Sequence, residues 1–392
     1  MRTLSIRILA LFFHDCEYGK KIRGDERRFL EVAKQFRNFG AKIYTLEWSP
    51  SLRKSFKGYE QTYTSFEIEK PKPKILRMPY LIIKVLTISR KLSFDIIYAH
   101  NQDIENMLLG YILKLIFKKP LVVVFHWEYK LFEEGLLRNI RQGRSLLTSL
   151  ALLILSVFIK KFVFRGVDLY FAVSEVVKNY IINELQIRPD KVVVSGDGVD
   201  NTKFKPCENT AKYDAAFLGR IDFHQKGIDV LLKAWKIVLA QKPSAKLIII
   251  GGFESEENRN RLYELLSKLD LNNNVQVTGF VRDEEIAKYL SMSKVFVFPT
   301  RFEGFGLSVI EAMACRLPCI ISDIPVLREL HSNVAMFVKP NDCNSFARAI
   351  ISLLDDREER RRLGDRSRVH ALRYKWEQVS EIEISAIRRI LR

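Results

Sequence analysis

The chain has 392 residues, enough for two or three domains with apolar cores of their own. Apolar residues make up 47% and charged residues 28%, which excludes both an intrinsically disordered chain and a disulfide-stapled miniprotein. The net charge is +18, and residues 1–200 carry 33 basic and 21 acidic side chains, so most of the excess lies in the first half. This charge favours phosphates, anionic lipid or nucleic acid as partners.

Two segments are candidates for a targeting or membrane signal. The first thirteen residues contain an apolar run of only six residues that meets His14 and Asp15, so they predict a strand and not a secretory signal peptide. The segment at 145–164 has an uninterrupted apolar core, Leu150–Leu155, far shorter than the roughly 18 residues that a membrane span needs. The sequence therefore predicts no transmembrane helix.

The cysteines indicate a reducing compartment. They are odd in number, dispersed, and never spaced C-x-x-C, which argues against a disulfide framework and against a structural zinc site. A cytoplasmic protein fits this pattern best. The five positions are Cys16, Cys207, Cys315, Cys319 and Cys343.

Strand-like and helix-like segments alternate through the first half. An amphipathic stretch at 26–39 predicts a helix that ends at Gly40, since glycine commonly follows a helix. Such alternation is typical of parallel sheets with crossover helices. Short β-rich runs predict strands over residues 6–13, 41–46, 94–99, 121–125, 169–173 and 191–194.

The second half repeats this scheme, so the predicted fold class is α/β, with two doubly wound Rossmann-like domains that face each other across a cleft. Open parallel sheets bind ligands outside the carboxyl ends of their strands, and site residues are sought there. Strands are predicted at 213–218, 245–250, 274–278, 294–298, 318–321 and 335–338, and helices at 227–240, 256–269, 283–291, 307–314 and 344–354.

The domain boundary is expected near 203–212, where proline and polar residues interrupt the apolar pattern. This divides the chain into 1–205 and 206–372, with a last helix at 373–392 that is expected to return to the first domain. The charge-dense stretch at 355–362 predicts a solvated helix face with ion pairs between residues four apart.

The most informative segment runs from Phe298 to Pro318 and predicts a buried strand, a glycine-bearing turn and a helix. Gly304 and Gly306 allow close approach of a ligand to the backbone, and a helix beginning near Leu307 directs free N–H groups to the same place. Such a turn is an anion site. Glu303 and Glu311 flank it, and carboxylates accept hydrogen bonds from sugar or ribose hydroxyls.

A second segment, Ala215 to Trp235, also predicts a strand, a loop and a helix. Arg220 follows the strand directly and Lys226 precedes the helix, so two cations meet at one strand end. A guanidinium fork and a mobile ammonium together suit the two phosphates of a diphosphate. Taken alone, this segment is equally compatible with two solvated surface cations.

These segments resemble the retaining glycosyltransferases of family 4, whose fold is the two-domain GT-B type. The likeness rests on the E-x₇-E spacing from Glu303 to Glu311 within EGFGLSVIEAMA, on GRIDFHQKG at 219–227 and on VSGDGVD at 194–200. VVVFHWE at 122–128 and a late Tyr374–Trp376 extend it over the whole chain.

The resemblance implies a role for each matching position. Arg220 and Lys226 would hold the donor diphosphate, and Glu311 would bind the ribose hydroxyls. Glu303 would meet the transferred sugar. The resemblance further implies contacts of the sugar and its phosphate with Gly304, Phe305, Gly306 and Leu307, and of the nucleobase with Gly279, Phe280 and Val281.

Three further positions are compared with the family pattern. His126 ends a strand and in the resembled family lies near the sugar and phosphate; a hydrogen-bonded structural histidine is the alternative. The first strand-to-helix loop has only Gly24 where the family usually has adjacent glycines. After the E-x₇-E helix Arg316 replaces a usual glycine, and a left-handed arginine there costs on the order of 1 kcal/mol.

The expected activity is retaining transfer of a sugar from a nucleoside diphosphate sugar to a saccharide or lipid-linked acceptor. No D-x-D triplet occurs in the sequence, so we expect neither a metal ion nor another cofactor. The acceptor is assigned to the first domain and the donor to the second. The positive charge and the segment at 145–164 suggest docking on an anionic membrane surface, with an internal helix as the equally weighted alternative.

Two other functions stay open. An epimerase of nucleotide sugars or a phosphorylase would share the fold, although no pyridoxal-binding lysine is evident. A nucleic-acid-binding protein is a more distant alternative, because Phe56, Tyr59, Tyr63 and Phe66 stand among lysines in a basic region. No recognised nucleic-acid motif accompanies these aromatic residues, and no such partner is expected.

Overall fold

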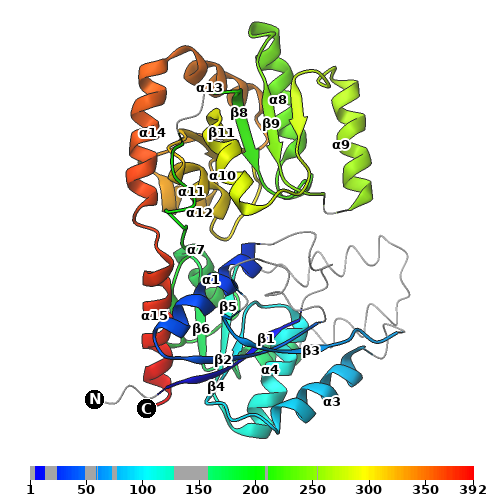
Figure 1. The fold of residues 1–392 in the computed structure, drawn as a ribbon, viewed down its shortest axis with the longest axis vertical. Coiled ribbons are helices and arrows are strands. Elements are labelled where there is room, and N and C mark those ends of the chain that lie inside the picture. Colours follow the sequence, from blue (N-terminus) through cyan, green and yellow to red (C-terminus); the bar gives the residue numbers. More distant parts are fainter. Residues whose placement is uncertain are drawn as a thin grey trace. The chain divides into compact units, whose positions relative to one another are not determined.

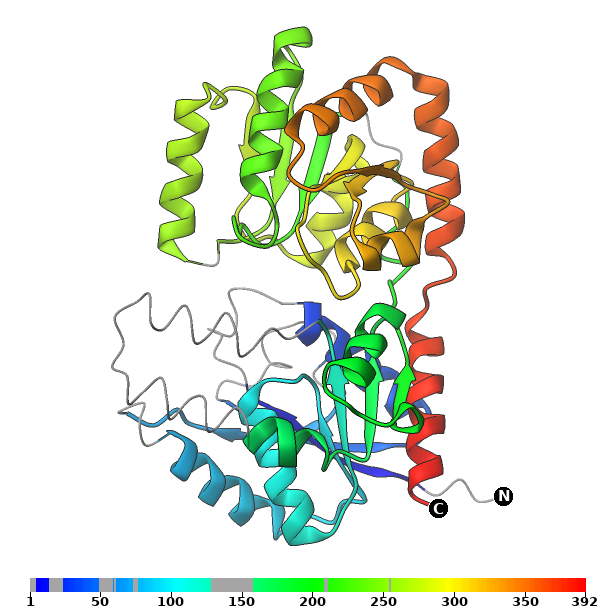
Figure 2. The ribbon, with the colours of Figure 1, turned by 180° about the vertical axis from the view of Figure 1, so that it is seen from behind.

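A computed structural model describes residues 5–13, 24–48, 59, 61–72, 77–127, 158–207, 211–253 and 255–392 (Figures 1 and 2). The chain forms two compact units, Met1–Gly196 with Glu377–Arg392, and Asp197–Trp376. The chain thus passes into the second unit nine residues before the boundary expected at 205, because the stretch before that point packs with the second unit. The final helix belongs to the first unit.

The described residues of the first unit form a seven-stranded parallel sheet in the order β3-β2-β1-β4-β5-β6-β7. Six of these strands confirm the sequence prediction. The edge strand β3 was not predicted, because its TSFEI sequence is short and half-buried and lacks an apolar run. The strands are β1 (Arg7–Phe12), β2 (Lys42–Trp48), β3 (Thr64–Ile68), β4 (Ile96–Ala99), β5 (Leu121–Phe125), β6 (Leu169–Ala172) and β7 (Val192–Val194).

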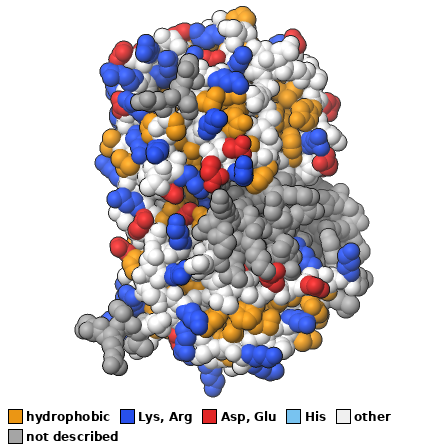
Figure 3. Space-filling model, in the orientation of Figure 1, with side chains coloured by type: hydrophobic (Ala, Val, Ile, Leu, Met, Phe, Trp, Pro, Cys, Tyr) orange, Lys and Arg blue, Asp and Glu red, His pale blue; other side chains and the backbone are white. Residues whose placement is uncertain are grey.

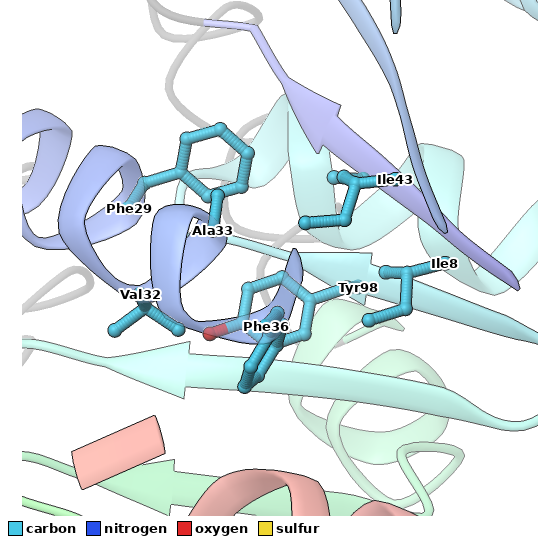
Figure 4. A pocket seen from close by; sticks show the side chains of 8 residues that line it. Ile8, Phe29, Val32, Ala33, Phe36, Ile43 and Tyr98 are labelled. Atoms are coloured by element: carbon cyan, nitrogen blue, oxygen red, sulfur yellow. The ribbon is translucent and has the colours of Figure 1, made fainter. Parts of the chain in front are cut away.

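Helices cover both faces of this sheet (Figures 1 and 2). Helix α1 packs an apolar face that includes Phe29 and Phe36 against β1, β2 and β4, and Figure 4 shows these rings around a small apolar void beside Tyr98. The described helices of the unit are α1 (Gly24–Asn38), α3 (Arg77–Ser89), α4 (Ile104–Phe117), η2 (Ile159–Phe164), α7 (Glu175–Asn183), η3 (Pro189–Lys191) and α15 (Trp376–Ile390).

A buried ion pair fixes α15 to the first unit. Arg28 of α1 and Glu383 of α15 are 1% and 0% exposed, and their charged atoms lie 2.5 Å apart. The Tyr98 hydroxyl donates to the second oxygen of Glu383 at 2.8 Å, and Arg28 also donates to Ser195 at 2.9 Å. Burial and the neighbouring carboxylate raise the pKa of Tyr98 well above its usual value, so it remains a donor.

The described residues of the second unit form a six-stranded parallel sheet in the order β10-β9-β8-β11-β12-β13. All six strands and the five predicted helices are confirmed, with ends shifted by at most two residues. The strands are β8 (Tyr213–Leu218), β9 (Leu247–Ile250), β10 (Val275–Val277), β11 (Ser293–Phe298), β12 (Cys319–Ser322) and β13 (Met336–Val338). The helices are α8 (Ile228–Gln241), α9 (Glu256–Lys268), α10 (Asp283–Ser291), α11 (Leu307–Ala314), α12 (Pro325–His331), α13 (Cys343–Asp355) and α14 (Arg357–Ala371).

The charge-dense stretch forms the start of α14, as predicted, but its ion pairs have a different spacing. They join Glu358 to Arg361 and Glu359 to Arg362, residues three apart and not four. Asp356, which was expected to pair with Arg360, instead caps the helix by accepting from the backbone N–H of Glu359 at 2.8 Å. Capping an otherwise unpaired N–H stabilises a helix more than an exposed ion pair does.

Arg316 adopts the strained conformation that the sequence predicted. Its φ is +66°, in the left-handed region, directly after the end of α11. An ion pair with Asp365 of α14 holds its side chain. Helix α11 is therefore followed by a residue with a slightly strained backbone, and contacts with α14 hold that residue in place.

A cluster of aromatic side chains lies at the carboxyl end of α12. The Nδ1 atom of buried His331 lies 3.2 Å from Nε2 of His370, which in turn lies 3.2 Å from the Tyr374 hydroxyl. Burial lowers the pKa of His331 to about 3 and raises that of Tyr374 to about 12. His331 is therefore neutral at ordinary pH.

The structure bears on two hypotheses from the sequence, the absence of a transmembrane helix and the aromatic cluster of a nucleic-acid-binding protein. Within the described ranges no helix is long and apolar enough to cross a bilayer. Residues 145–157 and Phe56 lie outside those ranges. Tyr59 and Tyr63 are buried, 9% and 5% exposed, and Phe66 is half-buried in β3, so these three do not form an open stacking platform for bases.

Candidate active site

The candidate site lies at the carboxyl ends of β8 and β11 in the second unit. These strands are hydrogen-bonded neighbours, and the chain order reverses between them, with β9 beyond β8 and β12 beyond β11. Connections after the two strands therefore leave the sheet in opposite directions, and open α/β sheets bind ligands at such a reversal point. Both sequence-predicted segments end here.

The loop from β8 to α8 carries the two predicted cations. The Asp222 carboxylate shapes the loop by accepting from the backbone N–H groups of His224 at 2.7 Å and Gln225 at 3.1 Å. Arg220, with a third of its side chain exposed, donates to the Gln225 side chain at 2.9 Å. The guanidinium thus lies at this edge of the sheet, held through its own loop.

Gly227 lets this loop pass directly under the neighbouring one. Its φ is +65°, and a Cβ there would lie 2.1 Å from the carbonyl oxygen of Pro299. Any side chain would push the β8 and β11 loops apart. Lys226, the preceding residue, is thereby brought against the residues that follow β11.

Lys226 and Glu303 form an ion pair in this place, with side chains 12% and 9% exposed. The ammonium also lies 5.2 Å from the ring centre of Phe298, the last residue of β11. The fully buried Thr300 hydroxyl lies 3.0 Å from the same Glu303 oxygen, Oε1, that Lys226 contacts. The structure therefore pairs Lys226, predicted to bind phosphate, directly with Glu303, predicted to bind the sugar.

Arg301 ties the two loops together. Its guanidinium donates to the carbonyl oxygen of Phe223 at 2.6 Å and to both oxygens of Asp229 at 3.0 and 2.9 Å. Its backbone N–H donates to the carbonyl oxygen of Gln225 at 2.8 Å, and its Nε donates to Asn341 at 2.8 Å. A lysine could not reproduce this planar fork.

The helix α11 begins at the same edge. Gly306 is its N-cap and Leu307 its first residue, so the N–H groups of the first turn are not capped by a side chain. Phe305 is buried and its ring packs on Tyr374 with centroids 5.7 Å apart. Gly304 precedes it in the turn. Glu311 lies on α11 and is only 4% exposed.

The predicted nucleobase segment lies at the same edge of the sheet, after β10. Gly279 pairs with Gly251, which follows β9, while Phe280 is 42% exposed and Val281 is half-buried. With strands about 4.8 Å apart, the end of β10 lies roughly 10 Å from that of β8. A nucleoside attached to a diphosphate spans a distance of this order.

His126 and Gly24 belong to the first unit. His126 ends β5 and is 7% exposed, and its Nε2 lies 2.9 Å from the carbonyl oxygen of His100 while its backbone N–H donates to Gln102. The ring is therefore held in the hydrogen-bonded arrangement that sequence reasoning gave as its structural alternative. Gly24 is the exposed first residue of α1, and the loop before it lies outside the described residues.

Sequence reasoning missed a polar network beside His126. Asn106 donates to Asn101 at 2.7 Å and to the carbonyl oxygen of Phe13 at 3.1 Å, and Asn101 donates to Asp25 at 3.2 Å. His100 lies in the same place, its ring stacked on Phe12. The signal was the run HNQD after a strand, four polar residues where a sheet normally gives way to a loop.

Sequence reasoning also missed Thr300 and Arg301, although both stand in the segment from Phe298 to Pro318, just before the E-x₇-E motif. Gly251 was missed as well: a Cβ there would lie 1.9 Å from the carbonyl oxygen of Gly219, and the Gly-Gly pair after β9 was the available signal. Among the described residues, no three His, Cys, Asp or Glu side chains come together as metal ligands would.

Two family models match the chain in succession. The model described as Glycosyltransferase Family 4 matches residues 22–203, and the model described as Glycosyl transferases group 1 matches residues 198–370. A structure of HepE from Anabaena, in complex with UDP and glucose, has a TM-score of 0.76 at 18% identity over 98% of this chain and all of that one. The fold is therefore shared with a GT-B protein.

Curated relatives add to this. O-antigen chain mannosyltransferase B of Escherichia coli is 24% identical over 55% of this chain and 58% of the relative. UDP-Gal:alpha-D-GlcNAc-diphosphoundecaprenol alpha-1,3-galactosyltransferase, also of Escherichia coli, is 29% identical over 46% of this chain and 49% of the relative. The chain thus spans about half the length of these relatives. The succession of the two family models, together with the two Rossmann-like sheets, shows a chain built from two glycosyltransferase family domains in a GT4-like arrangement, with the GT-B fold.

Proposed function

We propose that this protein transfers a sugar from a nucleoside diphosphate sugar to a saccharide or lipid-linked acceptor, with retention at the anomeric carbon and without a metal ion. One observation carries the proposal: the ion pair of Lys226 and Glu303 lies where two strand ends, Arg220 and the start of α11 meet. Cations and free N–H groups suit phosphates, and carboxylates suit hydroxyls. A sugar diphosphate presents both.

The diphosphate would be held by side chains of the β8 loop. Arg220 offers a planar fork for one phosphate and Lys226 a point charge for the other. The open first turn of α11 adds a partial positive charge at the same edge. These groups would stabilise the charge that grows on the diphosphate as the sugar leaves, the task that a metal ion performs in other transferases.

The nucleoside would extend from this point toward β10. Glu311 would accept hydrogen bonds from the ribose hydroxyls, and the backbone of Gly279 to Val281 would contact the base. The structure of HepE is described with UDP and glucose, which supports a nucleoside diphosphate in this fold.

Retention requires departure and attack on the same face of the sugar. In the route we propose, the bond from the anomeric carbon to the phosphate oxygen breaks, the acceptor hydroxyl bonds to that carbon, and its proton passes to the departing phosphate. Glu303 would hold sugar hydroxyls. His126 would orient the sugar from the first unit, since its ring is already fixed by a hydrogen bond.

The acceptor is proposed from the relatives. One relative is named for an O-antigen chain and another for a diphosphoundecaprenol-linked sugar, so saccharides and lipid diphosphates are the first acceptors to test. We propose a cytoplasmic location, because the four described cysteines are free thiols. Burial raises the pKa of Cys315 to about 12, so this thiol is not a nucleophile.

The test is a thermal-shift panel of nucleotide sugars followed by a transfer assay. We expect one class of nucleoside diphosphate sugar to raise Tm in the wild type and to raise it less in Lys226→Ala, whereas Lys236→Ala, an exposed change on α8, keeps the full shift. Binding without transfer to any acceptor, but with a change at the donor sugar itself, would indicate an epimerase.

Two further measurements test the finer parts of the proposal. Activity should survive treatment with EDTA, and loss of activity that only a divalent metal restores would overturn metal independence. The anomeric configuration of the product, read by NMR, should equal that of the donor. An inverted product would contradict retention.

A further inference from the structure

One face of the first unit combines exposed apolar side chains with unpaired cations. Figure 2 shows α3, α4 and η2 on the same side of the seven-stranded sheet, and both α3 and η2 pack against α4. Five large apolar side chains on these elements remain exposed, although each element has already buried another face against the sheet. They are Ile83 at 65%, Leu115 at 60%, Ile116 at 47%, Phe162 at 46% and Phe158 at 41%.

This concentration is unusual within the unit. In the described part of the first unit only one other large apolar side chain, Ile382 of α15, is exposed to this degree. Scattered exposed apolar residues are normal on soluble proteins, but a group of five on three packed helices is not. Helix α4 contributes two of the five, Leu115 and Ile116, since its sequence IENMLLGYILKLIF is apolar on its outer as well as its inner side.

Basic residues surround this group. Most of them lie at or near the carboxyl ends of the three helices, and none forms an ion pair with another described residue. Lys161 extends over the ring of Phe162, with its ammonium 5.7 Å from the ring centre, as a lysine does when its stem covers an apolar surface. The cations are Lys84, Arg90, Lys91, Lys118, Lys119, Lys161 and Arg165.

The described acids near this face are paired mainly with other cations, and of the basic group only Lys119 acts on one of them, Asp95. Glu105 pairs with Arg77 at 3.2 Å, and Asp168 pairs with Lys114 at 2.6 Å. Asp95, at the base of β4, pairs with Arg7 at 2.7 Å. The remaining field is positive. In Figure 3, hydrophobic side chains bordered by Lys and Arg are visible at the lower end of the first unit, where Figure 1 places α3 and α4.

We propose that α3, α4 and η2 form a docking face for an anionic lipid bilayer. Exposed leucine, isoleucine and phenylalanine side chains enter the boundary between headgroups and acyl chains, while lysines and arginines at the rim contact lipid phosphates. A bilayer fits better than a second copy of this chain, because a second copy would bring the same positive charge to the contact. The proposal goes beyond the transfer reaction and does not depend on it.

Vesicle sedimentation at low salt tests the docking face. The probe is phosphatidylcholine vesicles with and without about one third phosphatidylglycerol. We expect binding to the anionic vesicles that weakens as salt is raised, and little binding to the neutral ones. Wild-type protein that does not bind anionic vesicles at low salt overturns the proposal.

Two pairs of substitutions separate the apolar and the charged contributions. Leu115→Ser with Ile116→Ser should weaken binding at least tenfold, while Val369→Ser with Leu372→Ser, two equally exposed apolar residues on and after α14, should leave it unchanged. Circular dichroism and an unchanged donor-induced thermal shift show that each variant is folded. Equal effects of the two pairs overturn the assignment of the face.

Charge-reversal variants test the contribution of the basic residues. Lys118→Glu with Lys119→Glu should lower binding by more than about 25-fold, since each basic residue near an anionic surface contributes about fivefold. Lys233→Glu with Lys236→Glu on α8 changes the net charge equally and should have a much smaller effect. Light scattering tests the alternative that a second copy of this chain covers the face. A wild-type dimer that Leu115→Ser with Ile116→Ser converts to a monomer, without vesicle binding, overturns the lipid proposal.

Discussion

The two units carry different chemistry on the same framework. Both sheets contain the strand order 3-2-1-4-5-6, counted within each unit, and both place polar residues at the carboxyl ends of their central strands. In the second unit these residues are charged, with Lys226 paired to Glu303 and Arg301 paired to Asp229. In the first unit they are mainly amides and imidazoles in a buried network.

This difference teaches that the fold fixes where a ligand binds but not what binds. A cationic edge with an open helix start suits a diphosphate, whereas an edge of neutral donors and acceptors suits hydroxyl groups. The first unit has its buried ion pair elsewhere, between Arg28 and Glu383, where the pair holds the last helix. Each contrast can be tested by substitution.

The largest expected effect concerns stability of the first unit. Arg28→Ala leaves Glu383 buried and without its guanidinium partner, and removing one member of a buried pair costs about 3–5 kcal/mol. Urea unfolding followed by circular dichroism measures the loss. Arg328→Ala breaks an exposed pair with Asp323 in the second unit and should have a much smaller effect on stability. Similar losses in the two variants would contradict the role given to the buried pair.

The next effect concerns catalysis at the second unit. Lys226→Ala removes a cation from the proposed diphosphate site, and loss of one such stabilising group typically lowers the rate about 10²-fold to 10³-fold. Steady-state kinetics with the identified donor measures kcat/KM. Lys236→Ala, which removes an exposed cation from α8, is the matched control. A Lys226→Ala enzyme with nearly wild-type kcat/KM would remove this residue from the site.

The third effect is a pH dependence carried by the second unit. The pKa of His331 is about 3 in the folded protein and near 6.5 in an unfolded chain. Between these values only the unfolded chain binds the proton, so stability is complete above about pH 6.5 and falls as the pH is lowered toward 3. At pH 5 the loss from this group is about 2 kcal/mol.

Free energies of unfolding at pH 7.5 and pH 5 check this effect. His331→Gln should show a smaller difference between the two pH values than the wild type, whatever its absolute stability. His224→Gln, at an exposed position in the β8 loop, should keep the wild-type difference. An unchanged pH difference in His331→Gln would show that other groups carry the dependence.

The smallest effect sharpens the comparison between the loops. Arg301→Lys keeps the charge but loses the planar fork to Phe223 and Asp229, and we expect about a tenfold fall in kcat/KM from looser placement of Glu303. Asp229→Asn should act similarly, and the double variant should be less impaired than the product of the two. Fully multiplicative effects would mean that the pair does not position the loop.

Local pattern was sufficient for most elements and for the two loops of the second unit. Strands such as β8 and β11 end in continuous apolar runs, and the glycines and charges that follow them mark a strand-to-helix turn. The edge strand β3 carries no such signal, because one of its sides has no partner strand. Arg316 shows that a strained residue was predictable where the resembled family usually has a glycine after a helix.

Contacts between distant residues were not predictable. Arg28 and Glu383 are 355 positions apart, and nothing in either local sequence marks it as buried. Arg301 looked like one more loop cation until the fold brought Asp229 and the Phe223 carbonyl to it. Polar side chains that hold other parts of the protein and those that bind ligands are of the same residue types. Only the groups that they contact in the folded protein distinguish the two roles.

The oxygen shared at Glu303 has a consequence for selectivity. Its Oε1 atom lies against both the Lys226 ammonium and the Thr300 hydroxyl, so a ligand that attracts the ammonium away leaves a carboxylate in need of a new donor. A phosphate group whose oxygens are all ionised or esterified supplies none, whereas a sugar diphosphate brings sugar hydroxyls in the same molecule. If the site binds a sugar diphosphate as proposed, we expect it to favour ligands that supply both an anionic group for Lys226 and a hydroxyl donor for Glu303.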